Sequence, residues 1–250
     1  MTSQGMVPAP QDSPPEISPD SAAPRPSDGS QFEEMYDQKL AAADLRSYRK
    51  AGPRPWARSL IDALKAAGVN GATVLDIGGG IGVIRHELLA AGATRAISVE
   101  ASGAYAAVAR EEADRMGYTG RVTDLSGDFV QLAEGIGPVD VVILERVLNV
   151  YPEWERLASL AAERARRLYG VVVPRDTAFV RLVIRAINLV LRLRGRRVRA
   201  AVIPLGALDG VLRRAGLERR HSQSVGPAWQ VLIYHREHDG PAAYRSSEMG

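Results

Sequence analysis

The sequence of 250 residues contains no cysteine. This absence excludes disulfide bonds, thiolate metal ligands and any mechanism that needs a cysteine nucleophile, and it fits a reducing compartment. No run of about 18 uncharged apolar residues occurs, so we expect no membrane-spanning helix. The N-terminus also lacks a basic segment followed by an apolar one, so no signal peptide is expected. We therefore predict a cytoplasmic protein.

Lysine is scarce, because it occurs only at Lys39, Lys50 and Lys65, and arginine supplies the remaining basic charge. The net charge is only +3 and most charges are interspersed, so no nucleic-acid partner is indicated. Hydrophobic residues make up 46% of the chain, which is enough for the core of one domain. Residues 1–30, with seven of the fifteen prolines, and residues 239–250 are expected to be disordered tails.

Residues 73–84 combine a short strand, a glycine-rich turn and the start of a helix. Val74, Leu75 and Ile77 are typical of a strand that is buried on both faces. The glycines end this strand, and residues 85–90 begin a helix. Glycines allow a tight turn and the close approach of a ligand, and a helix N-terminus provides free amide donors. The stretch therefore predicts a site for a polar ligand.

The spacing of the glycines discriminates among ligands. A dinucleotide-binding loop has the pattern Gly-x-Gly-x-x-Gly, and this chain has Val83 at the position of the third glycine, which disfavours a dinucleotide. A P-loop is excluded because no Lys-Ser or Lys-Thr follows the glycines. The chain instead has Asp76 followed by Gly78, Gly80 and Gly82 at alternate positions. This pattern resembles motif I of the class I S-adenosylmethionine (SAM) dependent methyltransferases. The resemblance implies SAM as the cofactor.

Two later positions agree with this resemblance. Glu100 ends the apolar run at 95–100, and an acid there offers two acceptor oxygens to ribose hydroxyls, in SAM-binding and NAD-binding folds alike. Asp128 and Phe129 follow a strand at 121–125, where the family places an aspartate for the adenine amino group and an apolar residue over the ring. The implied cofactor-binding residues are Asp76, Gly78, Gly79, Gly80, Gly82, Glu100, Ala101, Asp128, Phe129 and Glu145.

The order of the apolar segments extends the resemblance over residues 31–238. It implies an α/β protein with the Rossmann-like class I methyltransferase fold: a seven-stranded, mostly parallel sheet with a C-terminal antiparallel hairpin, and helices on both faces. The expected elements after the third strand are a strand at 138–144, a helix at 154–168, a strand at 170–173, a helix at 205–215 and hairpin strands at 217–221 and 230–235.

Two helices are predicted within residues 31–67, ahead of the glycine loop. In the family such helices cap the cofactor pocket, so the resemblance implies an N-terminal helical cap. Tyr36, Tyr48 and Arg49 are then candidates for substrate contacts, with ordinary packing as the alternative.

The segment 178–200 is an addition to a minimal enzyme of this kind. Arg181, Arg185, Asn188 and Arg192 recur at spacings of four, three and four, which places them on one narrow stripe of a helix. The other positions form a broad apolar surface. Three interpretations remain open: a lid over a hydrophobic pocket, a basic helix on an anionic membrane surface, or a contact between copies. The width of the apolar surface favours the lid.

Missing motifs narrow the methyl acceptor. Amino-directed nucleic-acid methyltransferases carry Asn-Pro-Pro-Tyr or Asp-Pro-Pro-Tyr after the fourth strand, and this chain has neither motif. Methylation at pyrimidine C5 is excluded because it needs a cysteine nucleophile. No acidic cluster near 145–149 has the spacing of a magnesium site, so no metal is expected. A small-molecule acceptor remains, with oxygen preferred. Tyr151-Pro152 and the arginine-flanked helix also resemble the magnesium-protoporphyrin O-methyltransferases and related bacterial enzymes.

A hydroxyl acceptor would need a base, whereas a carboxylate acceptor would need none. His221, Tyr151 and Glu145 are the candidate catalytic residues. His86 and His235 fall within a predicted helix and a predicted strand, where a structural role is the better interpretation.

Two other functions are alternatives to methyl transfer. A non-catalytic SAM-binding partner or regulator, using 178–200 as an interface, stays open because no base is evident. An NAD-dependent oxidoreductase is disfavoured by Val83 and by the absence of a Tyr-x-x-x-Lys pair.

Overall fold

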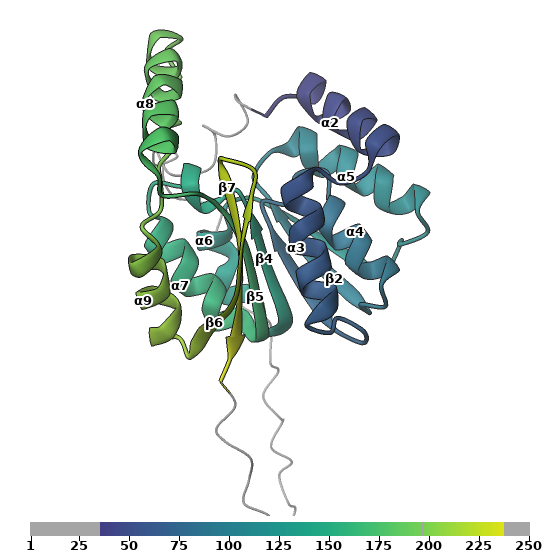
Figure 1. Cartoon of the computed structure of the whole chain (residues 1–250). Helices are drawn as coiled ribbons and strands as arrows, with labels where there is room; N and C mark the ends of the chain where they lie inside the picture. Colours follow the sequence, from purple (N-terminus) through teal and green to yellow (C-terminus); the bar gives the residue numbers. More distant parts are fainter. Residues whose placement is uncertain (1–35, 197, 238–250) are drawn as a thin grey trace, which may run out of the picture.

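A computed structural model describes residues 36–196 and 198–237, which form a seven-stranded sheet flanked by helices (Figure 1). The strand order is β3-β2-β1-β4-β5-β7-β6; β1 to β5 run parallel, and β7 is antiparallel to both β5 and β6. The strands are β1 (Thr73–Ile77), β2 (Arg95–Glu100), β3 (Val122–Ser126), β4 (Val139–Glu145), β5 (Ala165–Pro174), β6 (Leu217–Val225) and β7 (Trp229–Arg236). This topology confirms the predicted fold class.

Helices cover both faces of the sheet (Figure 1). The α-helices are α2 (Gln38–Ala51), α3 (Pro55–Ala66), α4 (Val83–Ala90), α5 (Gly103–Arg115), α6 (Phe129–Leu132), α7 (Trp154–Arg164), α8 (Ala178–Leu193) and α9 (Leu205–Arg214), and short 3₁₀ turns lie at Ala133–Gly135 and Leu148–Val150. One apolar core joins the sheet to Leu60 and Leu88 of α3 and α4. The other joins it to Leu157 and Leu212 of α7 and α9.

The centre of the sheet is apolar on both faces, as the sequence predicts for β1 and β4. Val141 and Ile143 of β4 belong to the core under α3 and α4, whereas Val142 and Leu144 belong to the core under α7 and α9. Because alternate residues of a strand point to opposite faces, one apolar run serves both cores. The carboxyl ends of β1 and β4 therefore form a rigid edge.

The first described helix, α2, is held over this edge by polar contacts with α5. Asp37 caps its N-terminus by accepting from the Leu40 amide at 2.9 Å. The Tyr105 hydroxyl donates to Asp44 at 2.7 Å, and Arg49 pairs with the buried Glu112 at 2.5 Å. These contacts place α2 as a cap, as expected for the segment before the glycine loop.

Two expected boundaries need correction. The helix predicted at 154–168 ends at Arg164, and β5 begins at Ala165 rather than at residue 170. The amino half of β5 is fixed by its neighbours, since Ala165 pairs with Val139 and Leu168 pairs with His235. The tails predicted at 1–30 and 239–250 lie outside the described residues.

The expectation that 178–200 forms a lid over the pocket is wrong for this structure. The helix α8 stands out from the body of the protein (Figure 1), and Val180 is its only buried residue. Asn188 of the polar stripe faces inward: its side-chain amide exchanges two hydrogen bonds of 2.8 Å with the backbone of Ala200. The apolar surface consequently faces outward.

The packing of α3 on β5 can be tested by a substitution at Gly170. A Cβ at this position would lie 3.0 Å from Leu60 Cδ1 and 3.3 Å from Leu64 Cδ2. We expect Gly170→Val to lower the free energy of unfolding by about 1–3 kcal/mol, because overpacking forces side chains off their rotamers. Denaturant unfolding measures this change. Gly137→Val is the matched control, since nothing lies within 4 Å of its added Cβ. Equal stability of the two variants would contradict the proposed packing.

Candidate functional site

A cavity of about 490 Å³ opens at the carboxyl edge of the sheet, beneath α2. This volume is in the usual range for a small-molecule site. Its walls include the residues after β1, β2, β3 and β4, together with the helical cap. Among the predicted residues, the cavity is lined by Tyr36, Tyr48, Gly78, Gly79, Gly80, Glu100, Ala101, Asp128, Phe129, Glu145 and Tyr151.

Asp76 and Gly82 do not line this cavity, although both were predicted to bind the cofactor. Asp76 is buried directly beneath the glycine loop, and a Cβ on Gly79 would overlap its carboxylate. Gly82 begins α4 with a φ of 81°, and a Cβ there would lie 2.7 Å from the Arg85 guanidinium carbon. Both residues therefore support the loop from behind rather than touching the cavity.

A fully buried guanidinium supports the loop from the same side. Arg85 donates to Ser98 Oγ at 2.5 Å and lies 3.7 Å from Asp76 Oδ2 and 3.7 Å from Asp124 Oδ1. Burial raises the pKa of Asp76 to about 6, and the charge of Arg85 opposes this shift. Neither Asp76 oxygen has a hydrogen-bond partner within the described residues.

Glu100 connects the loop to β2. Its Oε2 accepts from the Gly80 amide at 3.0 Å and its Oε1 accepts from the Ser102 amide at 2.9 Å. Burial raises its pKa, while these two amides lower it by stabilising the carboxylate. The carboxylate is thereby held at the cavity wall, next to the exposed backbone of the glycine loop.

Asp128 and Phe129 form the wall beyond β3. Asp128 caps α6 by accepting from the Val130 amide at 2.9 Å, and its other oxygen accepts from the Tyr151 hydroxyl at 2.8 Å. Burial and the neighbouring Asp128 charge raise the pKa of Tyr151. Because the hydroxyl is a committed donor with a raised pKa, Tyr151 orients Asp128 and is a poor base.

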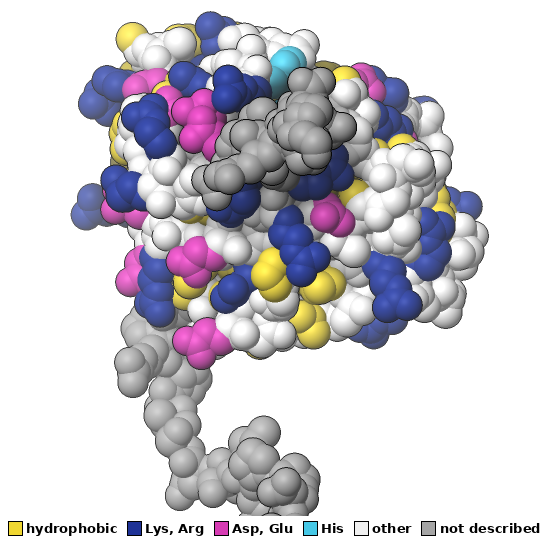
Figure 2. Space-filling model, turned by 90° about the horizontal axis from the view of Figure 1, so that it is seen from below, with side chains coloured by type: hydrophobic (Ala, Val, Ile, Leu, Met, Phe, Trp, Pro, Cys, Tyr) yellow, Lys and Arg dark blue, Asp and Glu magenta, His cyan; other side chains and the backbone are white. Residues whose placement is uncertain are grey.

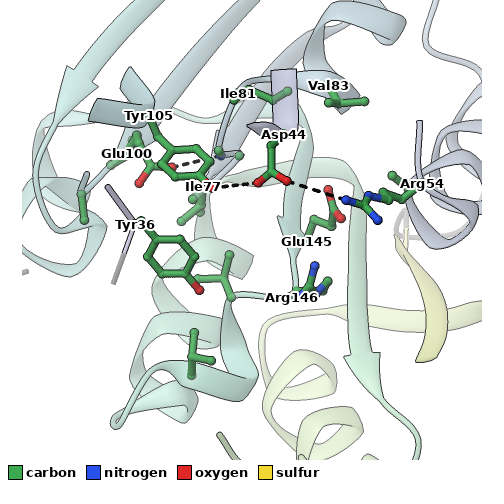
Figure 3. A pocket seen from close by; sticks show the side chains of 18 of the residues that line it. Tyr36, Asp44, Arg54, Ile77, Ile81, Val83, Glu100, Tyr105, Glu145 and Arg146 are labelled. Carbon is green, nitrogen blue, oxygen red and sulfur yellow. Dashed lines mark hydrogen bonds and ion pairs between the residues drawn. The ribbon is translucent and has the colours of Figure 1, made fainter. Parts of the chain in front are cut away.

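The opposite wall carries acids and aromatic rings from distant parts of the chain (Figure 3). Asp44 points between Tyr105 and Arg54, accepting from the tyrosine and lying 3.7 Å from the arginine. The Trp56 indole donates to Glu145 at 2.6 Å. Burial raises the pKa of Glu145, against the lowering effect of this hydrogen bond. Glu145 is thus a carboxylate held at the cavity wall by the Trp56 indole.

Arg146 has the only positive φ, 61°, among the non-glycine residues that the structure describes. Its guanidinium lies over a pair of neighbouring indoles, 5.1 Å from the Trp56 ring centre and 4.7 Å from that of Trp229, and the two ring centres are 5.6 Å apart. A left-handed arginine is costly, and such strain concentrates at functional sites. The two rings retain the cation beside the cavity through cation–π attraction.

The remaining predicted residues lie elsewhere. His221 is on β6, at the edge of the sheet and outside the cavity, so the prediction that it is the base loses its support. His86 is buried behind the loop, and its pKa is lowered to about 3, chiefly by burial. His235 lies on β7, and Arg49 pairs with Glu112 outside the cavity.

Sequence reasoning missed several residues of the cavity wall: Asp44, Arg54, Trp56, Tyr105, Arg146 and Asn149. Asn149 is buried, and its Oδ1 has no hydrogen-bond partner within the described residues. For Arg146 and Asn149 the sequence does contain a local signal, because both follow the central strand β4. No cluster of three or more potential metal-ligating side chains occurs among residues 36–196 and 198–237.

No family model matches the sequence, and no curated protein matches it. Solved structures, in contrast, match this chain. The magnesium protoporphyrin IX methyltransferase of Synechocystis PCC 6803 with bound SAH is 22% identical, with a TM-score of 0.60 over 72% of this chain and 82% of that one. An O-methyltransferase family protein from Burkholderia thailandensis is 19% identical, with a TM-score of 0.63 over 82% of this chain and 62% of that one.

A third solved structure is the O-methyltransferase family 2 protein from Planctomyces limnophilus in complex with apigenin. It is 18% identical, with a TM-score of 0.54 over 72% of this chain and 61% of that one. Together these likenesses establish the class I methyltransferase fold for the described residues.

The buried carboxyl of Asp76 gives a test based on pH. A folded-state pKa of about 6, above the ordinary 3.8, means that the native protein binds the proton more tightly than the unfolded chain. Its contribution to stability is therefore present below about pH 4 and is lost as the pH rises through about 6. We expect Asp76→Asn to gain stability relative to wild type between these pH values, by about 3 kcal/mol at most.

Denaturant unfolding of both proteins across this pH range measures the difference. The exposed Asp62→Asn is the control, and its curve is expected to run parallel to wild type. Parallel curves for Asp76→Asn as well would contradict the raised pKa.

Proposed function

We propose that this protein is a SAM-dependent methyltransferase that acts on a small molecule, preferentially at an oxygen atom. The observation that carries the proposal is one cavity of about 490 Å³ whose lining joins the glycine loop, Glu100 and Asp128 to Asp44, Glu145 and aromatic rings. The first group of residues suits a nucleoside, and the second offers polar and aromatic contacts to an acceptor. The class I methyltransferase fold supports the same conclusion.

The residues present fit SAM. Gly78, Gly79 and Gly80 line the cavity with bare backbone, so a ligand can approach the loop closely. Glu100 supplies carboxylate oxygens for ribose hydroxyls, and Asp128 with Phe129 supplies an acceptor and an apolar surface for adenine. Asn149 Oδ1, buried without a partner among the described residues, is a further acceptor at this wall. The solved Synechocystis enzyme, with SAH bound, supports this choice of cofactor.

SAM supplies an activated methyl group on a positively charged sulfur, so the protein's own contribution is binding and alignment. Carboxylates at Asp44 and Glu145, with the rings of Tyr36 and Trp56, make the adjoining wall favourable for a cation. The cap formed by α2 excludes water from this wall. In this proposal Glu100 and Asp128 fix the nucleoside, and the part of the cavity beside Glu145 receives the acceptor.

Arg146 and Glu145 support an oxygen acceptor. The Arg146 guanidinium is a donor for an acceptor oxygen that carries negative charge. Glu145 has a pKa raised by burial, which makes it a stronger base than an exposed glutamate for the proton of a hydroxyl acceptor. A carboxylate acceptor would need the arginine but no base.

Cofactor binding can be tested by calorimetric titration with SAM and with its demethylated product, SAH. Wild type is expected to bind both, and Gly80→Arg to bind neither, because the added side chain fills the loop side of the cavity. Gly137→Arg, at a position with no neighbour within 4 Å, is the matched control and should bind like wild type. Gly80 has a φ of 58°, so the fold of Gly80→Arg must be checked by circular dichroism.

Glu100→Ala provides a second variant that leaves every glycine of the loop in place. We expect it to weaken SAH binding by about 10- to 100-fold, through loss of charge-assisted hydrogen bonds. Absence of SAM and SAH binding by folded wild type would overturn the choice of cofactor.

Methyl transfer can be tested with isotopically labelled SAM and a panel of phenols, carboxylic acids and amines. We expect transfer to oxygen acceptors. For a phenol, Glu145→Gln should lower kcat by about 10²- to 10⁴-fold, and the wild-type rate should fall as the pH drops through the raised pKa of Glu145. For a carboxylate the same variant should have little effect. The control is Glu155→Gln, an exposed glutamate on α7.

Transfer to amines alone would contradict the oxygen preference. SAM binding without transfer to any member of the panel would favour the non-catalytic alternative, a SAM-binding partner or regulator.

A further inference from the structure

The helix α8 has an apolar surface that the described part of the chain leaves uncovered. Of the eight large hydrophobic side chains exposed among the described residues, every one except Leu40 is on this helix. They are Phe179, Leu182, Val183, Ile187, Leu189, Val190 and Leu193, with exposed fractions from 38% to 78%. A contiguous apolar surface of this kind marks an interaction site.

The charge around this surface has one sign. Residues 177–208 contain seven arginines and neither aspartate nor glutamate. Arg181 pairs with Asp176 at the foot of the helix, whereas Arg185, Arg192 and Arg194 form no ion pair within the described residues. The opposite end of the molecule differs: Figure 2 shows acidic and basic side chains side by side there, with only small hydrophobic patches. The helix thus offers positive charge, whereas the surface at the opposite end of the molecule is mixed.

We propose that α8 docks the protein on the surface of an anionic lipid bilayer. The outward leucines and Phe179 would enter the boundary between headgroups and acyl chains, and the arginines would reach lipid phosphates from the edges of the helix. Sixteen residues make a helix of about 24 Å, shorter than the hydrocarbon core. None of the described helices is long and apolar enough to cross a membrane. The helix therefore lies at the surface.

A second copy of the chain fits this surface less well. Two apposed α8 helices would bring their unpaired arginines together, with no acidic residue in 177–208 to compensate. Anionic phosphates supply the charge that the segment lacks.

The placement of α8 relative to the cavity adds a consequence. The helix follows the carboxyl end of β5, and it rises from the same end of the molecule as the cap helix α2 (Figure 1). Docking through α8 would therefore anchor the protein near its cavity end.

Flotation of the full-length protein with vesicles tests the proposal. We use phosphatidylcholine vesicles and vesicles with an equal share of phosphatidylglycerol, at about 0.1 M and about 1 M salt. We expect binding to the anionic vesicles at low salt and weaker binding at high salt. Failure of wild type to float with anionic vesicles at low salt would overturn the proposal.

Two double variants separate the apolar and the cationic contributions. Leu182→Asp with Leu189→Asp should abolish binding, and Arg185→Glu with Arg192→Glu should weaken binding to anionic vesicles by about tenfold or more. The matched controls are Leu40→Asp on α2 and Arg213→Glu with Arg214→Glu on α9, which should bind like wild type. All replaced side chains are exposed, so the melting temperatures should be similar.

Two further outcomes contradict the proposal. Equal binding by both α8 variants and wild type would show that another surface meets the lipid. Light scattering that finds a wild-type dimer, a monomer for the Leu182→Asp, Leu189→Asp variant and no vesicle binding would identify α8 as a contact between copies.

Discussion

The candidate site depends on one close contact, between the backbone of the glycine loop and the carboxylate of Asp76 beneath it. No side chain fits between them, because a Cβ on Gly79 would overlap the carboxylate. Gly78 donates to the Val99 carbonyl at 2.8 Å, and Gly80 donates to Glu100 at 3.0 Å. The loop is thereby fastened to β1 and β2, and its upper side is left as bare backbone facing the cavity.

The support of this loop is electrostatic as well as steric. Arg85 is fully buried beside Asp76 and Asp124, and its hydrogen bond to Ser98 ties the start of α4 to β2. A buried ion pair contributes little net stability, but removal of Arg85 would cost about 3–5 kcal/mol because the carboxylates of Asp76 and Asp124 would lose their cation. The arrangement therefore disfavours any displacement of α4 from the sheet, which keeps the loop amides in fixed positions.

Local patterns in the sequence placed several residues at the ends of strands, and the structure brings these residues together at the cavity. The glycine loop, Glu100 and the Asp128-Phe129 pair each follow a strand directly, so their placement at one edge is a consequence of parallel pairing. The contact between Trp56 and Glu145 at the cavity wall could not be predicted in this way. Trp56 and Glu145 meet across 89 residues of sequence, through the packing of α3 on the sheet. His221 illustrates the converse: its residue type suggested a base, but the order of β5, β7 and β6 carries it away from the cavity.

The arginine-striped helix shows why amphipathicity alone did not predict its position. Asn188 of the narrow polar stripe faces inward, where the backbone of Ala200 satisfies its side-chain amide. This pair of hydrogen bonds fixes the rotation of α8 about its axis. The helix period of 3.6 residues per turn fixes the positions of the side chains around the axis. When Asn188 faces inward, the leucines on the opposite side of α8 therefore face outward. The orientation of one polar side chain thus leaves the apolar surface of α8 facing away from the core.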